Sequence, residues 1–160
     1  MKSKILHVRQ RRRRLWWLAP GLWALLLFVA SSIPGTSYPQ VSFAFADKAV
    51  HALVYGFFGG LLARALANEF PGWTRFRVWA VAAGASLLYG ATDELHQAFV
   101  PNRSPDPKDL LADGLGAGIG AALVLAYLAG TARLRARRPS SSPSSSKEGV
   151  TPARTQPPRG

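Results

Sequence analysis

Residues 91–116, ATDELHQAFVPNRSPDPKDLLADGLG, are the stretch that decides how this chain folds. The stretch holds five carboxylates, a histidine, a glutamine and an arginine, yet a long apolar run precedes it and another follows it. Its centre, VPNRSPDPK, is rich in Pro, Asn and Ser, a composition typical of a connection between helices. The stretch therefore predicts two apolar helices joined by a polar turn.

Two more apolar runs lie upstream, and the four runs occupy residues 15–33, 47–67, 76–99 and 109–130. The first carries no charge and, at 1.5 Å per residue, spans about 28 Å, close to the roughly 30 Å hydrocarbon core of a bilayer. Because backbone that faces lipid must satisfy its own hydrogen bonds, all four runs are predicted to be helices. We therefore expect an all-α integral membrane protein, folded as a compact bundle of four transmembrane helices.

Basic residues predict the orientation of this bundle. The chain has 20 Lys and Arg against eight acids, and most of the basic residues lie before the first run or after the last. Arg64, Arg75 and Arg77 flank the connection between the second and third runs, whereas the first connection has no Lys or Arg before Lys48. The positive-inside rule places the N-terminus, the C-terminus and the middle connection in the cytoplasm. We expect a multi-pass protein of the cell (plasma) membrane.

Composition divides the chain into a basic N-terminus at residues 1–14, a transmembrane domain at 15–130 and a basic tail at 131–160. The tail is rich in Ser and Pro, which predicts disorder.

No zinc-finger spacing and no alternation of basic and aromatic residues is present, so no nucleic-acid partner is expected. The absence of Cys excludes disulfides and thiolate sites. An alternative is a signal peptide cleaved after Ala44-Phe45-Ala46, but the apolar core ends about a dozen residues earlier, which favours a retained helix.

The predicted topology brings six of the eight acids to the outer end of the helices. Each of the last three helices carries polar residues four positions apart, which share one face near that end. These residues are Asp47, His51 and Tyr55 on the second helix, Tyr89, Asp93 and Gln97 on the third, and Asp109 and Asp113 on the fourth. Ionisable groups at mid-membrane cost roughly 2.5–3.5 kcal/mol on insertion scales, and they usually face the bundle interior. We therefore expect the three faces to converge in an outward-opening polar pocket.

A structural role is the alternative for part of this set. Asp47 and Asp109 lie at helix starts, where carboxylates stabilise the free N–H groups and the helix dipole. Asp93 and Glu94 lie near a helix C-terminus, the unfavourable end of the dipole for a negative charge. We therefore expect both to have a cationic partner. The candidate partners are Arg103, Lys48 and protonated His51.

Small residues predict where helices approach closely. Gly56 and Gly60 in the second run, and Gly116 and Gly120 in the fourth, each form a GxxxG pair. Such pairs let two helix backbones pack tightly. Here they favour contacts inside a compact bundle over a dimer interface.

The segments DKAVHALVYGFFG and YGATDELHQAFVPNRSPDPKDLLADGLGAGIG resemble the VanZ-like family of membrane proteins. The matching residues are Asp47, Lys48, His51, Asp93, Glu94, Gln97, Phe99, Pro101, Arg103, Asp109, Gly116 and Gly120. Asp113 departs from the family pattern, in which Asn is often found. The resemblance covers residues 15–130 and implies a small four-helix membrane protein. Its founding member is associated with low-level resistance to the glycopeptide teicoplanin, but the family has no settled biochemical activity, so the resemblance leaves open whether this protein is an enzyme.

Residues from the spacing and from the resemblance make up one candidate functional pocket. They are Asp47, Lys48, His51, Tyr55, Tyr89, Asp93, Glu94, Gln97, Arg103, Asp109 and Asp113. The first hypothesis is a cell-envelope protein whose pocket binds membrane lipids, a cell-wall precursor or a glycopeptide antibiotic.

The second hypothesis is a membrane-embedded enzyme acting on a lipid-linked substrate. His51, Asp93 and Glu94 would serve as acid, base or nucleophile, while Arg103 and Lys48 would hold a phosphate. A transporter is disfavoured, because the central parts of the four runs hold no ionisable residue. The oligomeric state stays open.

Metal binding is a minor alternative. His51, His96, Asp93 and Glu94 have suitable donor atoms, but His51 lies on a different predicted helix from the other three, and the sequence does not give the distance between the two helices. We predict no cofactor and no metal from the sequence.

Overall fold

The computed structural model describes residues 14–37 and 46–137, which form four α-helices and one 3-10 turn. The elements are α2 (Leu18–Ser31), η1 (Gly35–Ser37), α3 (Ala46–Glu69), α4 (Arg75–Gln97) and α5 (Pro107–Ala136). The predicted all-helical class is confirmed, and each predicted run coincides with a helix. Residues 1–13, most of the tail and the site of the alternative cleavage lie largely outside the described residues.

Helix α5 is longer than predicted, and its last turns occupy the start of the predicted tail. It continues to Ala136 rather than ending at Gly130. The added residues include Ala, Leu and Arg, which are good helix formers. Arg133 and Arg135 lie in its last turn, where positive charge stabilises the C-terminal end of the helix dipole.

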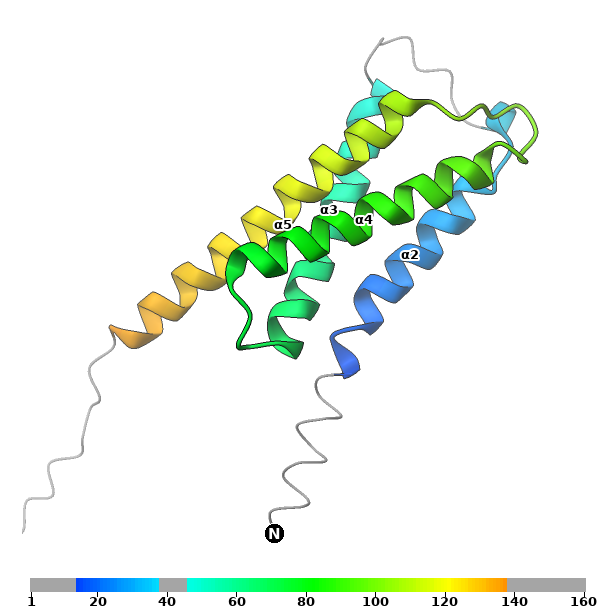
Figure 1. The fold of residues 1–160 in the computed structure, drawn as a ribbon. Helices are drawn as coiled ribbons and strands as arrows, with labels where there is room; N and C mark the ends of the chain where they lie inside the picture. The colour runs from blue at the N-terminus through cyan, green and yellow to red at the C-terminus, as the bar shows by residue number, and fades with distance from the viewer. Residues whose placement is uncertain (1–13, 38–45, 138–160) are drawn as a thin grey trace, which may run out of the picture.

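Successive helices run in alternating directions (Figure 1). The last turns of α2 and α4 therefore lie at the same end of the molecule as the first turns of α3 and α5. We call this the polar end, because it holds Lys48, His51, Glu94 and Asp109. Helix α2 contacts α3 and α4 but not α5 in the part of the chain that the structure describes.

The tightest helix contact is a glycine seam between α3 and α5. A methyl group added at Gly116 would overlap the backbone of Ala52, and one at Gly120 would overlap the backbone of Gly56. A methyl group at Gly59 would likewise overlap the backbone of Ala117. Glycines here let two helix backbones touch, as expected for small residues at a membrane helix interface. The two GxxxG pairs thus serve a contact inside the chain.

An apolar core holds α3, α4 and α5 together at the end opposite the polar end. Its buried residues are Ala63 and Leu66 on α3, Val78 and Ala82 on α4, and Ala121 and Leu125 on α5. Trp79 packs against this core, and its indole Nε1 donates a hydrogen bond to the carbonyl oxygen of Gly118 at 2.9 Å. The three helices are therefore fixed at this end, which sets the spacing of their side chains at the polar end.

The outside of the molecule is apolar, whereas its interior is partly polar. Leu53 on α3 is 73% exposed and Leu123 on α5 is 66% exposed, while Asp113 is 1% exposed. This arrangement is the reverse of that in soluble proteins and suits a chain surrounded by lipid.

Two helices, α3 and α5, are long and apolar enough to cross a membrane by length and composition. Helix α2 is apolar but has 14 residues. Helix α4 is less apolar than these two, since it begins with Arg75 and Arg77 and its last turns carry Asp93, Glu94 and Gln97.

Candidate functional site

The α4–α5 connection positions the acids of the polar end. Asp106 is the N-cap of α5, and its carboxylate accepts a hydrogen bond from the backbone N–H of Lys108 at 2.9 Å. Pro107 follows at the first helical position, where a missing N–H costs least. Asn102 has a φ of 57°, which turns the chain, and the N–H of Gly35 donates to the carbonyl oxygen of Pro101 at 3.2 Å. The connection is thereby anchored beside the end of α2.

Lys48 joins the start of α3 to the start of α5. Its ammonium lies 2.9 Å from a carboxylate oxygen of Asp47 and 2.7 Å from oxygens of both Asp106 and Asp109. The hydrogen bond from Lys48, together with that from the Lys108 N–H, holds the pKa of the Asp106 carboxyl below its usual range. Three carboxylates thus share one cation, which leaves net negative charge at this end.

His51 pairs with the most deeply buried acid. Its Nδ1 lies 2.9 Å from Oδ1 of Asp113, and its Nε2 lies 3.9 Å from Oδ2 of Asp109. Gly90 on α4 makes room for this pair, because an added Cβ would lie 2.9 Å from Oδ2 of Asp113. The imidazole is therefore held between two carboxylates of α5.

Asp93 and Glu94 accept hydrogen bonds from uncharged donors. Asp93 Oδ2 accepts from the Tyr55 hydroxyl at 3.3 Å and from the Gln97 amide at 3.4 Å. Glu94 Oε2 accepts from the backbone N–H of Asp106 at 2.8 Å. The second oxygen of each carboxylate, Asp93 Oδ1 and Glu94 Oε1, is buried with no hydrogen-bond partner among the described residues.

No cationic partner contacts Asp93 in the part of the chain described, whereas a ring nitrogen of His51, one of the predicted partners, lies within 4.8 Å of a carboxylate oxygen of Glu94. Neither carboxylate forms an ion pair with a described Lys, Arg or His. Lys48 is engaged by the acids of α3 and α5, and the Nε of Arg103 donates to the carbonyl oxygen of Ile33 at the end of α2. The hydrogen bonds that the two carboxylates accept come from uncharged donors, which are a peptide N–H, a tyrosine hydroxyl and a glutamine amide.

Two side chains that the sequence placed with the acids face α2 instead. The Tyr89 hydroxyl donates to the carbonyl oxygen of Ala24 at 2.6 Å, and its ring packs against Phe58. His96 lies with Nε2 3.0 Å from the hydroxyl of Ser32. The alternative metal set of His51, His96, Asp93 and Glu94 is therefore not brought together. Instead, His51, Glu94 and Asp109 lie together, with potential ligand atoms all within 4.8 Å of one another.

A cavity of about 610 Å³ lies beside these acids, between α2, α3 and α4. Its polar lining is Asp47, His51, Tyr55, Asp93, Gln97 and Arg103, with Ser31 from α2. Its apolar lining includes Leu27 from α2 and Val50 and Val54 from α3. The other candidate residues do not line this cavity; they are Lys48, Tyr89, Glu94, Asp109 and Asp113. The predicted pocket is thus divided into this cavity and a cluster of charged residues, Lys48, Glu94, Asp109 and Asp113, that lies outside the cavity lining.

Sequence reasoning missed two residues of this region. Asp106 carries the N-cap of α5 and binds Lys48, and the Asp-Pro pair at residues 106–107 was a signal for that cap. Gly90 makes room for Asp113, and no sequence signal distinguishes it from glycines such as Gly84, which has nothing within 4 Å of an added Cβ.

A helical chain with leucines on its outside and carboxylates inside is typical of the integral membrane proteins. The sequence profile of the VanZ/LLP1 family matches residues 16–129, so the chain belongs to this family of membrane proteins. The resemblance to VanZ-like proteins is thereby confirmed. Searches of curated proteins and of solved structures give no match.

Proposed function

We propose that the chain is a multi-pass protein of the plasma membrane, with four transmembrane helices and both termini in the cytoplasm. The alternating directions of the four helices support this topology (Figure 1). So does the charge distribution. Arg64, Arg75 and Arg77 lie toward the end opposite the polar end, as the positive-inside rule requires of a cytoplasmic side. The polar end then opens toward the outer leaflet.

The proposed role of the cavity at this end is to bind the polar headgroup of an envelope lipid. The observation that carries this proposal is the lining of the cavity. Apolar side chains such as Leu27 and Val54 form part of the wall, and His51, Asp93 and Gln97 converge on the rest. A largely apolar pocket with a few converging polar groups is typical of small-molecule sites. A membrane lipid has the matching parts, which are an apolar acyl chain and a polar headgroup.

The charges favour a headgroup with an amine and a phosphate. Asp47 and Asp93 line the cavity and attract a positive group, while Arg103 lines it as well and is suited to a phosphate. A volume of about 610 Å³ falls within the range of drug-sized ligand pockets, roughly 300–1,000 Å³. A lipid headgroup or the end of a lipid-linked cell-wall precursor fits that size. A glycopeptide such as teicoplanin would enter it with one part of the molecule.

Lipid binding to matched variants tests the proposal. Val50 lines the cavity, and Val50→Trp narrows it, whereas Leu53 lies on the same helix outside this cavity. Native mass spectrometry of the full chain with zwitterionic and anionic lipids, a lipid-linked precursor and teicoplanin would measure binding. We expect Val50→Trp to weaken retention of a zwitterionic lipid at least about tenfold, about 1.4 kcal/mol, and Leu53→Trp to leave it unchanged. Equal retention by both variants contradicts headgroup binding in this cavity.

A second candidate function is an enzyme acting on a lipid-linked substrate. The observation in its favour is the pair of His51 and Asp113, in which a buried carboxylate 2.9 Å from the imidazole fixes the ring orientation. A histidine held in this way is suited to general acid–base chemistry at the cavity wall. Incubating the protein with isotope-labelled envelope lipid extract and separating the products tests it. Identical products from wild type and His51→Gln rule the activity out.

A further inference from the structure

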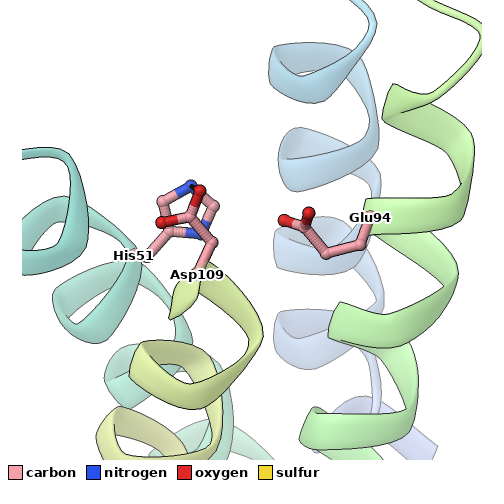
Figure 2. Close-up of side chains that lie close together, drawn as sticks. All are labelled: His51, Glu94 and Asp109. Carbon is pink, nitrogen blue, oxygen red and sulfur yellow. Dashed lines mark ion pairs between the residues drawn. The ribbon is translucent and has the colours of Figure 1, made fainter. Parts of the chain in front are cut away.

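We propose that His51, Glu94 and Asp109 form a binding site for one divalent transition-metal ion, with Zn²⁺ as the leading candidate. The three residues come from α3, α4 and α5, and Figure 2 shows the carboxylate of Glu94 pointing toward the other two side chains. The proposal goes beyond headgroup binding, because Glu94 and Asp109 do not line the cavity.

The spacing of the donor atoms suits a shared ion. Zinc binds imidazole nitrogen at about 2.0–2.1 Å and carboxylate oxygen at about 2.0–2.2 Å, so two ligand atoms at the tetrahedral angle lie about 3.4 Å apart. His51 Nε2 and Asp109 Oδ2 are 3.9 Å apart. All three donor atoms lie within 4.8 Å of one another, so side-chain movements of about 1 Å would bring them to the separation that zinc requires.

The buried carboxylate of Glu94 indicates that a cation binds at this site. The residue is 8% exposed, and its Oε1 has no hydrogen-bond partner among the described residues. A buried charged oxygen without a partner costs more than the 1–3 kcal/mol typical of an unsatisfied neutral group, so it requires a proton or a cation. Its oxygens are directed toward His51 and Asp109, as Figure 2 shows, where a bound cation would satisfy them.

The hydrogen bond between His51 Nδ1 and Asp113 leaves the other ring nitrogen, Nε2, to bind a metal ion. In the neutral tautomer in which Nδ1–H donates to Oδ1 of Asp113 at 2.9 Å, Nε2 carries the lone pair and does not donate to Asp109. A metal-binding histidine commonly donates its other nitrogen to a carboxylate in this way, which fixes the tautomer and orients the ring. Asp113, which is 1% exposed, would therefore act as a positioning residue rather than as a ligand.

Charge and donor type indicate the class of ion. Asp109 and Glu94 bring two negative charges to the site, and Asp109 shares the single ammonium of Lys48 with Asp47 and Asp106. A dication balances this excess. One imidazole with two carboxylates favours Zn²⁺ or Mn²⁺ over Mg²⁺ and Ca²⁺, which prefer sets made of oxygen alone.

Metal content of the full-length protein tests the site without any lipid ligand. The protein is purified in detergent, stripped with a chelator, dialysed against Zn²⁺, and its metal content is measured by mass spectrometry. We expect one equivalent of Zn²⁺ per chain in wild type and none in Glu94→Gln or His51→Gln. Asp93→Asn is the matched control, since it neutralises the adjacent buried carboxylate, and it should retain the ion. Asp113→Asn should weaken binding about 10- to 100-fold through the orientation of His51.

Spectroscopy keeps the proposal falsifiable if a variant does not fold. X-ray absorption at the Zn edge of the wild-type protein should show an all-nitrogen and oxygen shell with imidazole scattering. Absence of stoichiometric Zn²⁺ in wild type overturns the site, as does Zn²⁺ retained by both Glu94→Gln and His51→Gln, or a shell without imidazole. Binding of Mg²⁺ or Ca²⁺ in place of Zn²⁺ and Mn²⁺ overturns the assigned class of ion. None of these results bears on headgroup binding, which is measured with lipid.

Discussion

At the scale of single residues, the polar end depends on which side chains pair across helices. Helical spacing predicted that His51 and Asp113 each lie on an inward face, and the structure places both inside the bundle. The spacing did not predict that they bind each other, because the rotation of one helix against another is set by packing at the apolar end. The same limit explains Lys48, whose three carboxylate partners come from two helices.

A substitution at Gly90 tests this packing. In Gly90→Ala, the new Cβ would lie 2.9 Å from Asp113 Oδ2 and 3.3 Å from the Tyr55 ring, so the His51–Asp113 pair must shift. We expect a loss of about 1–3 kcal/mol in the free energy of unfolding. Thermal unfolding in detergent would measure it.

Gly84→Ala provides the control on the same helix. An added Cβ at Gly84 meets nothing within 4 Å, so helix propensity alone applies and should stabilise the chain by up to about 1 kcal/mol. A Gly90→Ala protein as stable as Gly84→Ala would show that the space beside Asp113 is not needed.

At the scale of helices, the apolar runs predicted the elements well because each run is long and bounded by Pro, Gly or Asn. The extension of α5 to Ala136 was missed, because the arginines after Gly130 end the apolar run although the helix itself continues through them. The sequence also could not predict which helices contact one another. Glycine pairs indicated close approach, but they did not say that α3 and α5 would face each other.

The glycine seam gives a prediction at this scale. In Gly120→Ala, the added methyl group would overlap the backbone of Gly56, and neither backbone can rotate away as a side chain can. We expect α3 and α5 to separate and the free energy of unfolding to fall by about 1–3 kcal/mol or more. Titration with a denaturing detergent, followed by circular dichroism, would measure the change.

Gly130→Ala is the matched control, because it lies on the same helix and an added Cβ meets nothing within 4 Å. It should leave stability unchanged or raise it slightly. If the two alanine variants unfold alike, the close approach of α3 and α5 does not contribute to stability.

At the scale of the whole molecule, the proposed topology is open to a direct test because the chain has no cysteine. Ser104 lies exposed in the α4–α5 connection, and Gly72 lies exposed in the α3–α4 connection. In intact cells, a membrane-impermeant maleimide should label Ser104→Cys but should label Gly72→Cys after permeabilisation alone. The reverse pattern would invert the orientation, and labelling of both in intact cells would contradict the four-span topology.

Helix α2 forms one wall of the cavity. Hydrogen bonds from the Tyr89 hydroxyl to the Ala24 carbonyl oxygen, and between Ser32 and His96, hold this helix to α4. Its outer surface is apolar, with Leu22 and Leu26 exposed. On the proposed function, a lipid would reach the cavity sideways, past this wall, without leaving its leaflet. The rate of loading would then depend on the two-dimensional density of the lipid in the leaflet, and a change in membrane composition would alter occupancy even with the amount of protein held constant.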